Sequence, residues 1–371
     1  MKFIKKIICL ILCAALLFTV TACSKGGVEK AMIDTLFSDT SKISYSEKYT
    51  ELKAKKKNST KRWREGMVSG NGMQGFVESG SPYSDTFIFQ NMHFIMPNPN
   101  VRYCPETFDE LETVKQNIAT GQDIVDNANY DDVYRFHPGG QLRIALDGKG
   151  ESNYVRYTDY ESSQTGVHYE NNDGKWDRTS FTSMADGAVI TKLTKSSDGA
   201  KLNMTLSFDD LASMANFGNG DEVNLKYKKP VDENSDYLAL VAHYPNYENS
   251  ELIDGGYATL TYVVTDGKKE NVELKKNMDE DQFVGSKNEG IKITDADSVY
   301  LVTISDRDYN MGKFDAFDSQ EDFDLITSLA NQAKAVVDKY SVDGSFDYDT
   351  ALKNHLSIYQ PQFDAVTISL E

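Results

Sequence analysis

Apolar and polar residues alternate along most of the chain between Trp63 and Tyr309, as they do in strands that bury one face. Gln141–Leu146 shows this alternation without interruption. The turn sequence 171–174 (Asn-Asn-Asp-Gly) separates two such runs and is typical of a β-hairpin. Many strands with short polar turns and few helices favour a sandwich over a βαβ fold. Further strands are expected at Gly166–Glu170, Lys175–Phe181, Ala188–Thr194, Lys201–Phe208, Tyr237–His243, Tyr257–Val264 and Val299–Ile304.

A helical period appears at two places before the end of this region. Apolar positions spaced three and four apart predict a short amphipathic helix at Val28–Phe37. The same spacing in Glu106–Ala119 predicts a helix inserted between strands. The fold class expected is therefore mainly β: a large two-sheet antiparallel sandwich (a super-sandwich) over residues 63–318, with helices as additions.

After residue 318 the spacing of apolar residues changes from the alternation of a strand to the three-to-four-residue spacing of a helix. Ser319 and Asp322 have the spacing of a capping box, and a helical apolar face follows up to Tyr340. A second helix is expected from Tyr348, and Pro361 should bend or end it. One more strand is expected at Ala365–Leu370. We interpret residues 319–371 as a helical linker that starts a further, catalytic domain missing from this chain.

A glycine-rich stretch lies near the start of the β region. Gly70, Gly72 and Gly75 have the G-x-G-x-x-G spacing of a dinucleotide-binding loop. Such a loop should open a helix, but here an apolar run that reads as a strand follows Gly75. We therefore predict a tight turn at Asn71-Gly72 between two strands and no nucleotide cofactor.

The N-terminus has the pattern of an export signal. Lys5 and Lys6 precede the apolar run Ile7–Val20, which is too short to span a membrane, and Ala22-Cys23 follows. A Cys directly after a small residue resembles a bacterial lipobox. We expect residues 1–22 to be a lipoprotein signal peptide, Cys23 to be the lipid-attachment residue, and 23–62 to be a tether with one short helix. The protein would then be exported and lipid-anchored on the extracytoplasmic face of the bacterial cell membrane.

Charge narrows the choice of partner. The formal net charge is -18, and a surface so acidic repels phosphate backbones, so nucleic-acid binding is disfavoured. A neutral partner is favoured instead. The basic run in residues 53–62 is interpreted as a solvated segment, with contact to anionic head groups as the alternative. Once the signal is removed, Cys104 is the one remaining cysteine apart from Cys23, so no intrachain disulfide is expected.

Five segments follow one another in order: Trp63 with Gly70-Asn71-Gly72 and Gly75, then Phe136–Ile144, Tyr157–Glu161, Trp176–Ser183, and His355–Val366 with His, Tyr and Phe four residues apart. Together they resemble the N-terminal domain of glycoside hydrolase family 95, the α-L-fucosidase and α-L-galactosidase group. The resemblance runs from Trp63 to the last residue. The chain departs from the family pattern at Phe89–Ile95, where members carry Leu-Asn-Glu-Asp-x-Leu-Trp, and at Pro361.

This resemblance implies a sandwich followed by a helical linker and an (α/α)6 barrel that carries the general acid and base. No catalytic residue is therefore expected in this chain, and its partner would be such a barrel, in cis or in trans. Glycoside hydrolysis needs two accessible carboxyls, one with a raised pKa. The acidic pairs here, such as Asp209-Asp210, lie in polar turns, and none is expected in an apolar setting.

The polar and aromatic residues predict a candidate site for a sugar but none for a metal ion. The five histidines are scattered without ligand spacing, so no metal site is predicted. Sugar contact remains, with Asn71, Gln90 and His93 as candidate substrate-binding residues. Rings at Trp63, Tyr83 and Trp176 could stack on sugars, although aromatic residues in strands more often form core.

The sequence thus predicts the N-terminal sandwich of an exported glycoside hydrolase that acts on extracellular glycans of the α-L-fucoside type. The sandwich would pack on a barrel and shape one wall of its cleft. The alternative is a surface lipoprotein that binds carbohydrate without cleaving it. A remnant with no partner is a third possibility, and it would expose an apolar patch and aggregate.

Overall fold

The computed structural model describes residues 27–48, 65–96, 111–122, 135–196, 199–210, 225–244, 255–274, 288–312 and 319–365. Cys23, Trp63, Cys104, the basic run 53–62 and nearly all of the strand expected at the C-terminus lie outside these residues. Within the described part, no helix combines the length and apolar character needed to cross a membrane.

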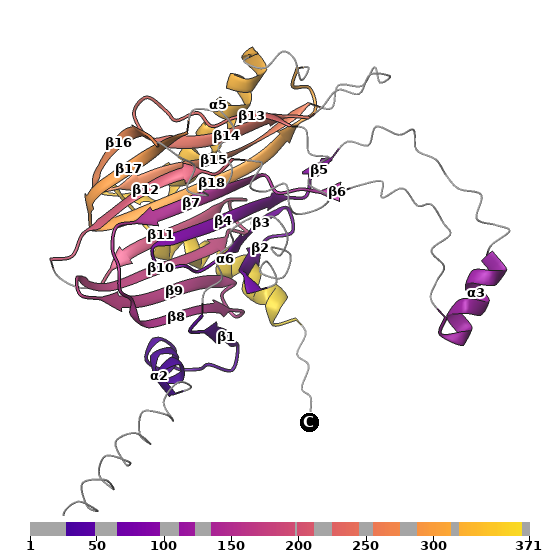
Figure 1. The fold of residues 1–371 in the computed structure, drawn as a ribbon, viewed down its shortest axis with the longest axis horizontal. Helices are drawn as coiled ribbons and strands as arrows, with labels where there is room; N and C mark the ends of the chain where they lie inside the picture. The colour runs from indigo at the N-terminus through magenta and orange to yellow at the C-terminus, as the bar shows by residue number, and fades with distance from the viewer. Residues whose placement is uncertain are drawn as a thin grey trace, which may run out of the picture.

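Two large antiparallel sheets form the body of the molecule, as the alternation predicts (Figure 1). The nine-stranded sheet has the order β1 (Ile43–Ser46), β8 (Ser152–Asp159), β9 (Gln164–Asn171), β10 (Gly174–Thr182), β11 (Val189–Lys195), β18 (Ser298–Asp308), β15 (Gly256–Thr265), β14 (Tyr237–His243) and β13 (Lys226–Lys228). The seven-stranded sheet has the order β16 (Lys268–Glu273), β17 (Glu289–Ala296), β12 (Leu202–Phe208), β7 (Gly140–Leu146), β4 (Ser84–Asn91), β3 (Gln74–Glu78) and β2 (Met67–Gly70).

The period of two places five neighbouring strands of the nine-stranded sheet (β10, β11, β18, β15 and β14) between two apolar cores. On β14, Leu238, Leu240 and Ala242 face the seven-stranded sheet, whereas Ala239 and Val241 face the helices. The first core is rich in rings from both sheets. The second lies between the sheet and two C-terminal helices, α5 (Gln320–Lys339) and α6 (Tyr348–Phe363). The described body therefore has three layers, and the helices form one of them.

Local sequence signals place these helices correctly. The Asp322 carboxylate accepts the Ser319 N–H at 3.0 Å, which is half of the predicted capping box. Its other oxygen pairs with His243 on β14, so the same residue also fastens α5 to the sheet. A short hairpin, β19 (Ser341–Val342) and β20 (Ser345–Phe346), joins α5 to α6. Pro361 lies inside α6, which continues to Phe363, so it does not end the helix; the alternative expectation, a bend at Pro361, stays a prediction.

Three smaller elements complete the fold. α2 (Gly27–Leu36) confirms the first predicted helix, and α3 (Leu111–Thr120) confirms the inserted one. β1, which pairs with β8, lies in the stretch interpreted as a tether and was not predicted, because its four residues are too few for a clear alternation. A two-stranded ribbon, β5 (Ile95–Met96) and β6 (Arg135–Phe136), stands at the end of β4 (Figure 1).

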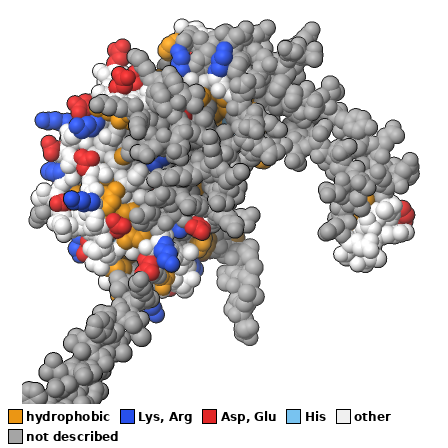
Figure 2. Space-filling view, in the orientation of Figure 1, with side chains coloured by type: hydrophobic (Ala, Val, Ile, Leu, Met, Phe, Trp, Pro, Cys, Tyr) orange, Lys and Arg blue, Asp and Glu red, His pale blue; other side chains and the backbone are white. Residues whose placement is uncertain are grey.

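The visible surface carries charges of both signs. Lys and Arg side chains are interspersed with Asp and Glu along the left edge of the described part (Figure 2). The edge strand β16 reads Lys-Lys-Glu-Asn-Val-Glu, and charged edges of this kind disfavour pairing with another chain.

Candidate functional site

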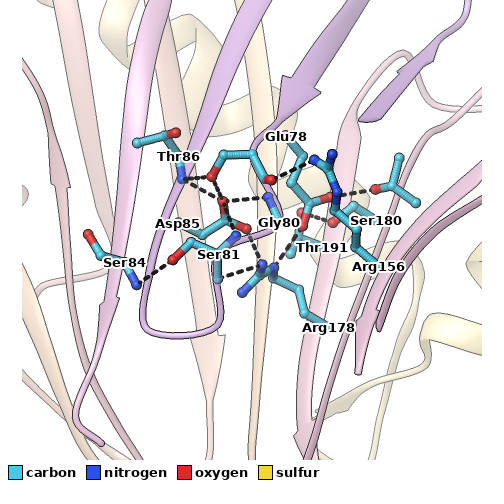
Figure 3. A network of polar contacts seen from close by, with 12 residues as sticks. Glu78, Gly80, Ser81, Ser84, Asp85, Thr86, Arg156, Arg178, Ser180 and Thr191 are labelled. Carbon is cyan, nitrogen blue, oxygen red and sulfur yellow. Dashed lines mark hydrogen bonds and ion pairs between the residues drawn. The ribbon is translucent and has the colours of Figure 1, made fainter. Parts of the chain in front are cut away.

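A closed polar network lies between the two sheets. Arg178 on β10 donates through Nε to Glu78 on β3 at 2.8 Å and through an Nη to Asp85 on β4 (Figure 3). The Thr165 hydroxyl donates to the other Glu78 oxygen at 2.5 Å. Asp85 also accepts the backbone N–H of Gly80 at 2.9 Å. Side-chain exposure is 0% for both acids and 3% for the arginine, so water does not reach them.

The electrostatics of this network follow from its burial. Loss of hydration raises the pKa of Glu78 from 4.5 to about 7, and the nearby Asp85 charge adds to this while the Arg178 charge opposes it. A carboxyl with a raised pKa beside a second carboxyl is the usual sign of a glycosidase acid. Here, however, both carboxyls are sealed and share one guanidinium, so no glycosidic bond could lie between them. The network holds the sheets together.

Two further buried ion pairs correct the expectation for the acidic turns. Asp209 is 0% exposed and receives both Nε and Nη of Arg143, at 3.0 and 2.5 Å. Asp210 is 1% exposed and pairs with Lys229 at 2.8 Å. The prediction that Asp209-Asp210 is a solvated turn is wrong, because cations far along the chain fold onto it. Glu78, which is not one of the acidic pairs considered in the sequence, is the carboxyl whose buried setting raises its pKa.

An open groove of about 250 Å³ lies at the opposite end of β3 and β4 from the network. The hairpin segment 72–75, the end of β4 (Gln90–Met92) and Phe136 form its walls. Its rim is apolar, with Met73, Met92 and Phe136 exposed by 50%, 45% and 64%. The predicted hairpin turn at Asn71-Gly72 is confirmed: Gly72 has φ +88°, and β3 follows it instead of a helix.

The three predicted sugar-binding residues have different positions. Gln90 lines the groove, and its side-chain amide has no hydrogen-bond partner among the described residues. The amide of Asn71 is engaged within the protein: it donates to Ser183 O at 3.0 Å and accepts the N–H of Met73 at 3.0 Å. His93 lies just beyond the end of β4, with Nδ1 3.7 Å from the Asp306 carboxylate. The structure thus brings Gln90 to the groove and gives Asn71 a role in the turn.

The other candidates are in the core or form no cluster. Trp176 is 7% exposed, stacks on Tyr169 and donates from Nε1 to Asn171 Oδ1 at 2.9 Å, which makes it a core residue. Tyr83 is half-buried with its edge against the same Tyr169. Within the described part of the chain, no group of three or more His, Cys, Asp or Glu could hold a metal ion.

One turn connects the groove to the helical layer. The β10–β11 turn, residues 183–187, accepts hydrogen bonds from Asn71 at Ser183 O and from Gln74 at Gly187 O. On the helical side, the Met184 N–H donates to His355 of α6 at 3.1 Å. The Asp186 carboxylate accepts Lys339 Nζ at 2.6 Å and the Tyr340 hydroxyl at 2.9 Å.

The helical motif at His355, Tyr359 and Phe363 has a structural explanation. Residues four apart share a helix face, and these three rings stack in sequence along α6 with centroids 5.3 and 5.8 Å apart. His355 Nε2 donates to Ser162 O at 3.2 Å, and burial lowers its pKa, which favours the neutral ring that this pairing needs. The motif docks α6 on the sheet.

Comparison with known proteins identifies a family. The model described as "Glycosyl hydrolase family 65, N-terminal domain" matches residues 54–311. No curated protein sequence matches the chain. A solved structure titled putative kojibiose phosphorylase from human microbiome is similar at 10% identity and TM-score 0.38, over 79% of this chain and 32% of that one. A family GH92 inverting mannosidase from Bacteroides thetaiotaomicron is similar at 10% identity and TM-score 0.26, over 61% and 30%. The chain thus spans about a third of each of these structures.

Proposed function

Because this chain belongs to the family of glycosyl hydrolase family 65 N-terminal domains, we propose that it is the non-catalytic sandwich of an exported enzyme acting on extracellular glycans. The observation that carries the proposal is the family match over residues 54–311, a stretch that contains both large sheets apart from β1. The finer assignment, an α-L-fucoside-type specificity as in family 95, is also part of the proposal and is supported by the five ordered segments.

Catalysis is assigned to a partner domain, an (α/α)6 barrel in cis or in trans. Three of the described carboxylates with the deepest burial, Glu78, Asp85 and Asp209, are locked to arginines and have no access to a substrate. The groove, by contrast, is open and carries an amide without a partner among the described residues. The sandwich would therefore shape one wall of the cleft rather than supply the acid and base.

The partner domain can be tested directly at the gene. Reading the native DNA past codon 371 in all frames should show a barrel coding region in frame or in a neighbouring gene. The resulting complex should hydrolyse an aryl α-L-fucoside faster than other aryl glycosides. A genuine stop codon with no barrel gene nearby would overturn the proposal.

Export and lipid anchoring complete the proposed function and rest on the sequence of residues 1–23. Labelled palmitate should be incorporated by the chain in a bacterial host and not by a Cys23→Ser variant, which should also leave the membrane fraction. Equal labelling of both variants would contradict the anchor.

The second candidate function is capture of carbohydrate without cleavage, which the open, uncharged groove favours. The two candidates differ in one observable. A capture module has the same affinity for its glycan with or without a barrel, whereas a sandwich that forms one wall of a cleft binds the glycan more tightly when the catalytic domain is present.

A further inference from the structure

The groove between the β2–β3 hairpin, the end of β4 and Phe136 stands out because none of the described residues that line it is charged. The chain carries a net charge of -18, yet the groove residues are glycines, amides, methionines and one phenylalanine. Among these described lining residues, a cationic ligand would find no carboxylate and an anionic ligand would find no Lys or Arg. An uncharged ligand fits this lining best.

The rim supplies one flat apolar surface. The Phe136 side chain is 64% exposed, although its backbone is fixed by pairing with Ile95 in the β5–β6 ribbon. The backbone of the next residue is held as well, since the His137 N–H donates to Phe94 O at 3.0 Å. A rigid, solvent-facing ring costs little conformational entropy when a ligand stacks on it. Sugar rings present C–H groups on one face, and that face suits an aromatic ring.

The groove also holds three amides, of which two are engaged in the protein. Gln74 donates to Gly187 O and accepts the Ser305 N–H at 3.2 Å. Asn91 donates to Ser305 O at 2.7 Å and accepts the His93 N–H at 2.9 Å. These contacts hold the groove in shape. Gln90, between them on the lining, has no partner among the described residues and offers a donor and an acceptor side by side.

We propose that this groove binds one pyranose ring of a neutral glycan, with Phe136 stacked on the sugar face and the Gln90 amide hydrogen-bonded to ring hydroxyls. This deepens the proposed function and rests on it for the class of ligand. The volume of about 250 Å³ lies just below the range of pockets that enclose drug-sized ligands, so the groove holds a single ring and not an oligosaccharide. So small and open a contact gives a Kd on the order of 1 mM.

Titration of the purified full chain tests this, with saturation-transfer NMR as the readout. The probes are the methyl glycosides of L-fucose, D-galactose, D-glucose and D-mannose. We expect Phe136→Ala to weaken binding about tenfold and Gln90→Ala several-fold, while Phe136→Trp keeps it. Phe323→Ala is the matched control, because this phenylalanine of α5 is 57% exposed but lies outside the groove. Thermal unfolding should be unchanged in all four variants.

The outcomes separate this inference from the proposed function. Binding that is lost in Phe136→Ala but kept in Phe323→Ala supports the groove, whether or not a barrel is found. No binding of any probe at 20 times the expected Kd, or equal loss in the control, would overturn it. If the complex with a barrel hydrolyses glycosides and Phe136→Ala leaves KM unchanged, the groove assignment fails and the proposed function stands.

Discussion

The two ends of the β3–β4 strand pair have opposite characters. At one end, Glu78 and Asp85 are ionisable and completely closed, and they share Arg178. At the other end, Gln74 and Gln90 are uncharged, and they line an open groove. Both ends belong to the same sheet and are joined by the same register, Gln74 opposite Asn91 and Glu78 opposite Phe87.

This difference shows what each end can do. A buried charge without its partner is very unfavourable, so the closed end is specified by its pairing and contributes to a unique arrangement of the sheets. An uncharged amide can lie at an open surface at little cost and remain available to a ligand. Among the described residues, no carboxyl lines the accessible end of this pair, and sugar recognition is the function we propose for that end.

Removing the shared cation should have the largest effect. Arg178→Met leaves Glu78 and Asp85 buried without a counter-charge and should lower the free energy of unfolding by about 3–5 kcal/mol, measured by urea denaturation. Adding Glu78→Gln removes one of the two stranded charges, so the double variant should be more stable than Arg178→Met alone. Lys334→Met, in an exposed pair with Asp338, should cost less than about 1 kcal/mol. A loss in Arg178→Met as small as that of Lys334→Met would mean that the network is not closed.

Glu78 should also leave a signature in the pH dependence of stability. Its pKa is raised on folding from 4.5 to about 7, so the folded state binds the extra proton. The stability contribution is complete below pH 4.5 and is lost as pH rises to about 7, by roughly 2–3 kcal/mol. The Glu78→Gln variant lacks this pH-dependent contribution, so the substitution should lower the free energy of unfolding more at pH 5 than at pH 8. His137 titrates in the opposite sense, since burial lowers its pKa to about 4. The His137 contribution is common to both proteins and cancels in the difference between the free energies of unfolding of the wild type and Glu78→Gln. If that difference does not depend on pH, the assignment of the raised pKa to Glu78 is refuted.

The turn that supports the groove should show an intermediate effect. Gln74→Ala leaves Gly187 O and the Ser305 N–H without their partner and should cost about 1–3 kcal/mol. Asn71→Ala should behave similarly, since Ser183 O loses one of its two donors and keeps only the Gly187 N–H. Asn71→Asp keeps the acceptor for the Met73 N–H but replaces the donor to Ser183 O with a carboxylate oxygen that repels it, so a loss of stability in this variant comes from the Ser183 side. Full stability in both alanine variants would contradict the connection through the β10–β11 turn.

Gln90→Ala should have the smallest effect on stability. Its amide has no described partner to lose, so the change should stay within about 0.5 kcal/mol. Gln74→Ala is the matched comparison: the same residue type in the same groove, but engaged in the protein. A cost for Gln90→Ala equal to that of Gln74→Ala would show that both ends of the strand pair serve stability alone.

Local patterns were sufficient for the eight strands expected from alternation, the hairpin at Asn71-Gly72 and the start of α5 after Ser319, because alternation, turn residues and capping are short-range effects. They did not predict β1, β13, β16 or β17. The closed network could not be predicted in this way. Arg178 meets Glu78 across 100 positions of sequence, and an isolated Glu in a strand reads as a surface residue. Asp209-Asp210 was misread for the same reason, since Arg143 lies 66 positions away.

The groove was predictable only in part. The candidate residue Gln90 lines the groove near the glycine-rich hairpin, but the side-chain amide of the candidate Asn71 is engaged within the turn. Phe136 was not recognised as a stacking surface, because only the pairing of β6 with β5, some 40 residues earlier, brings it to the rim. The resemblance to family 95 predicted the two-sheet sandwich, which is confirmed. The family that matches is the N-terminal domain of family 65, and the fucoside specificity stays a prediction.

Activity of the isolated chain tests the central claim most directly, namely that this sandwich positions a glycan and leaves the chemistry to a partner. The purified chain should be incubated with aryl α-L-fucoside, α-D-glucoside and α-D-mannoside, with and without phosphate, at pH 5 to 8. The account predicts no release of the aryl alcohol above the uncatalysed rate. Turnover that disappears in a folded Glu78→Gln variant, or on substitution of any other carboxylate of the chain, would contradict it.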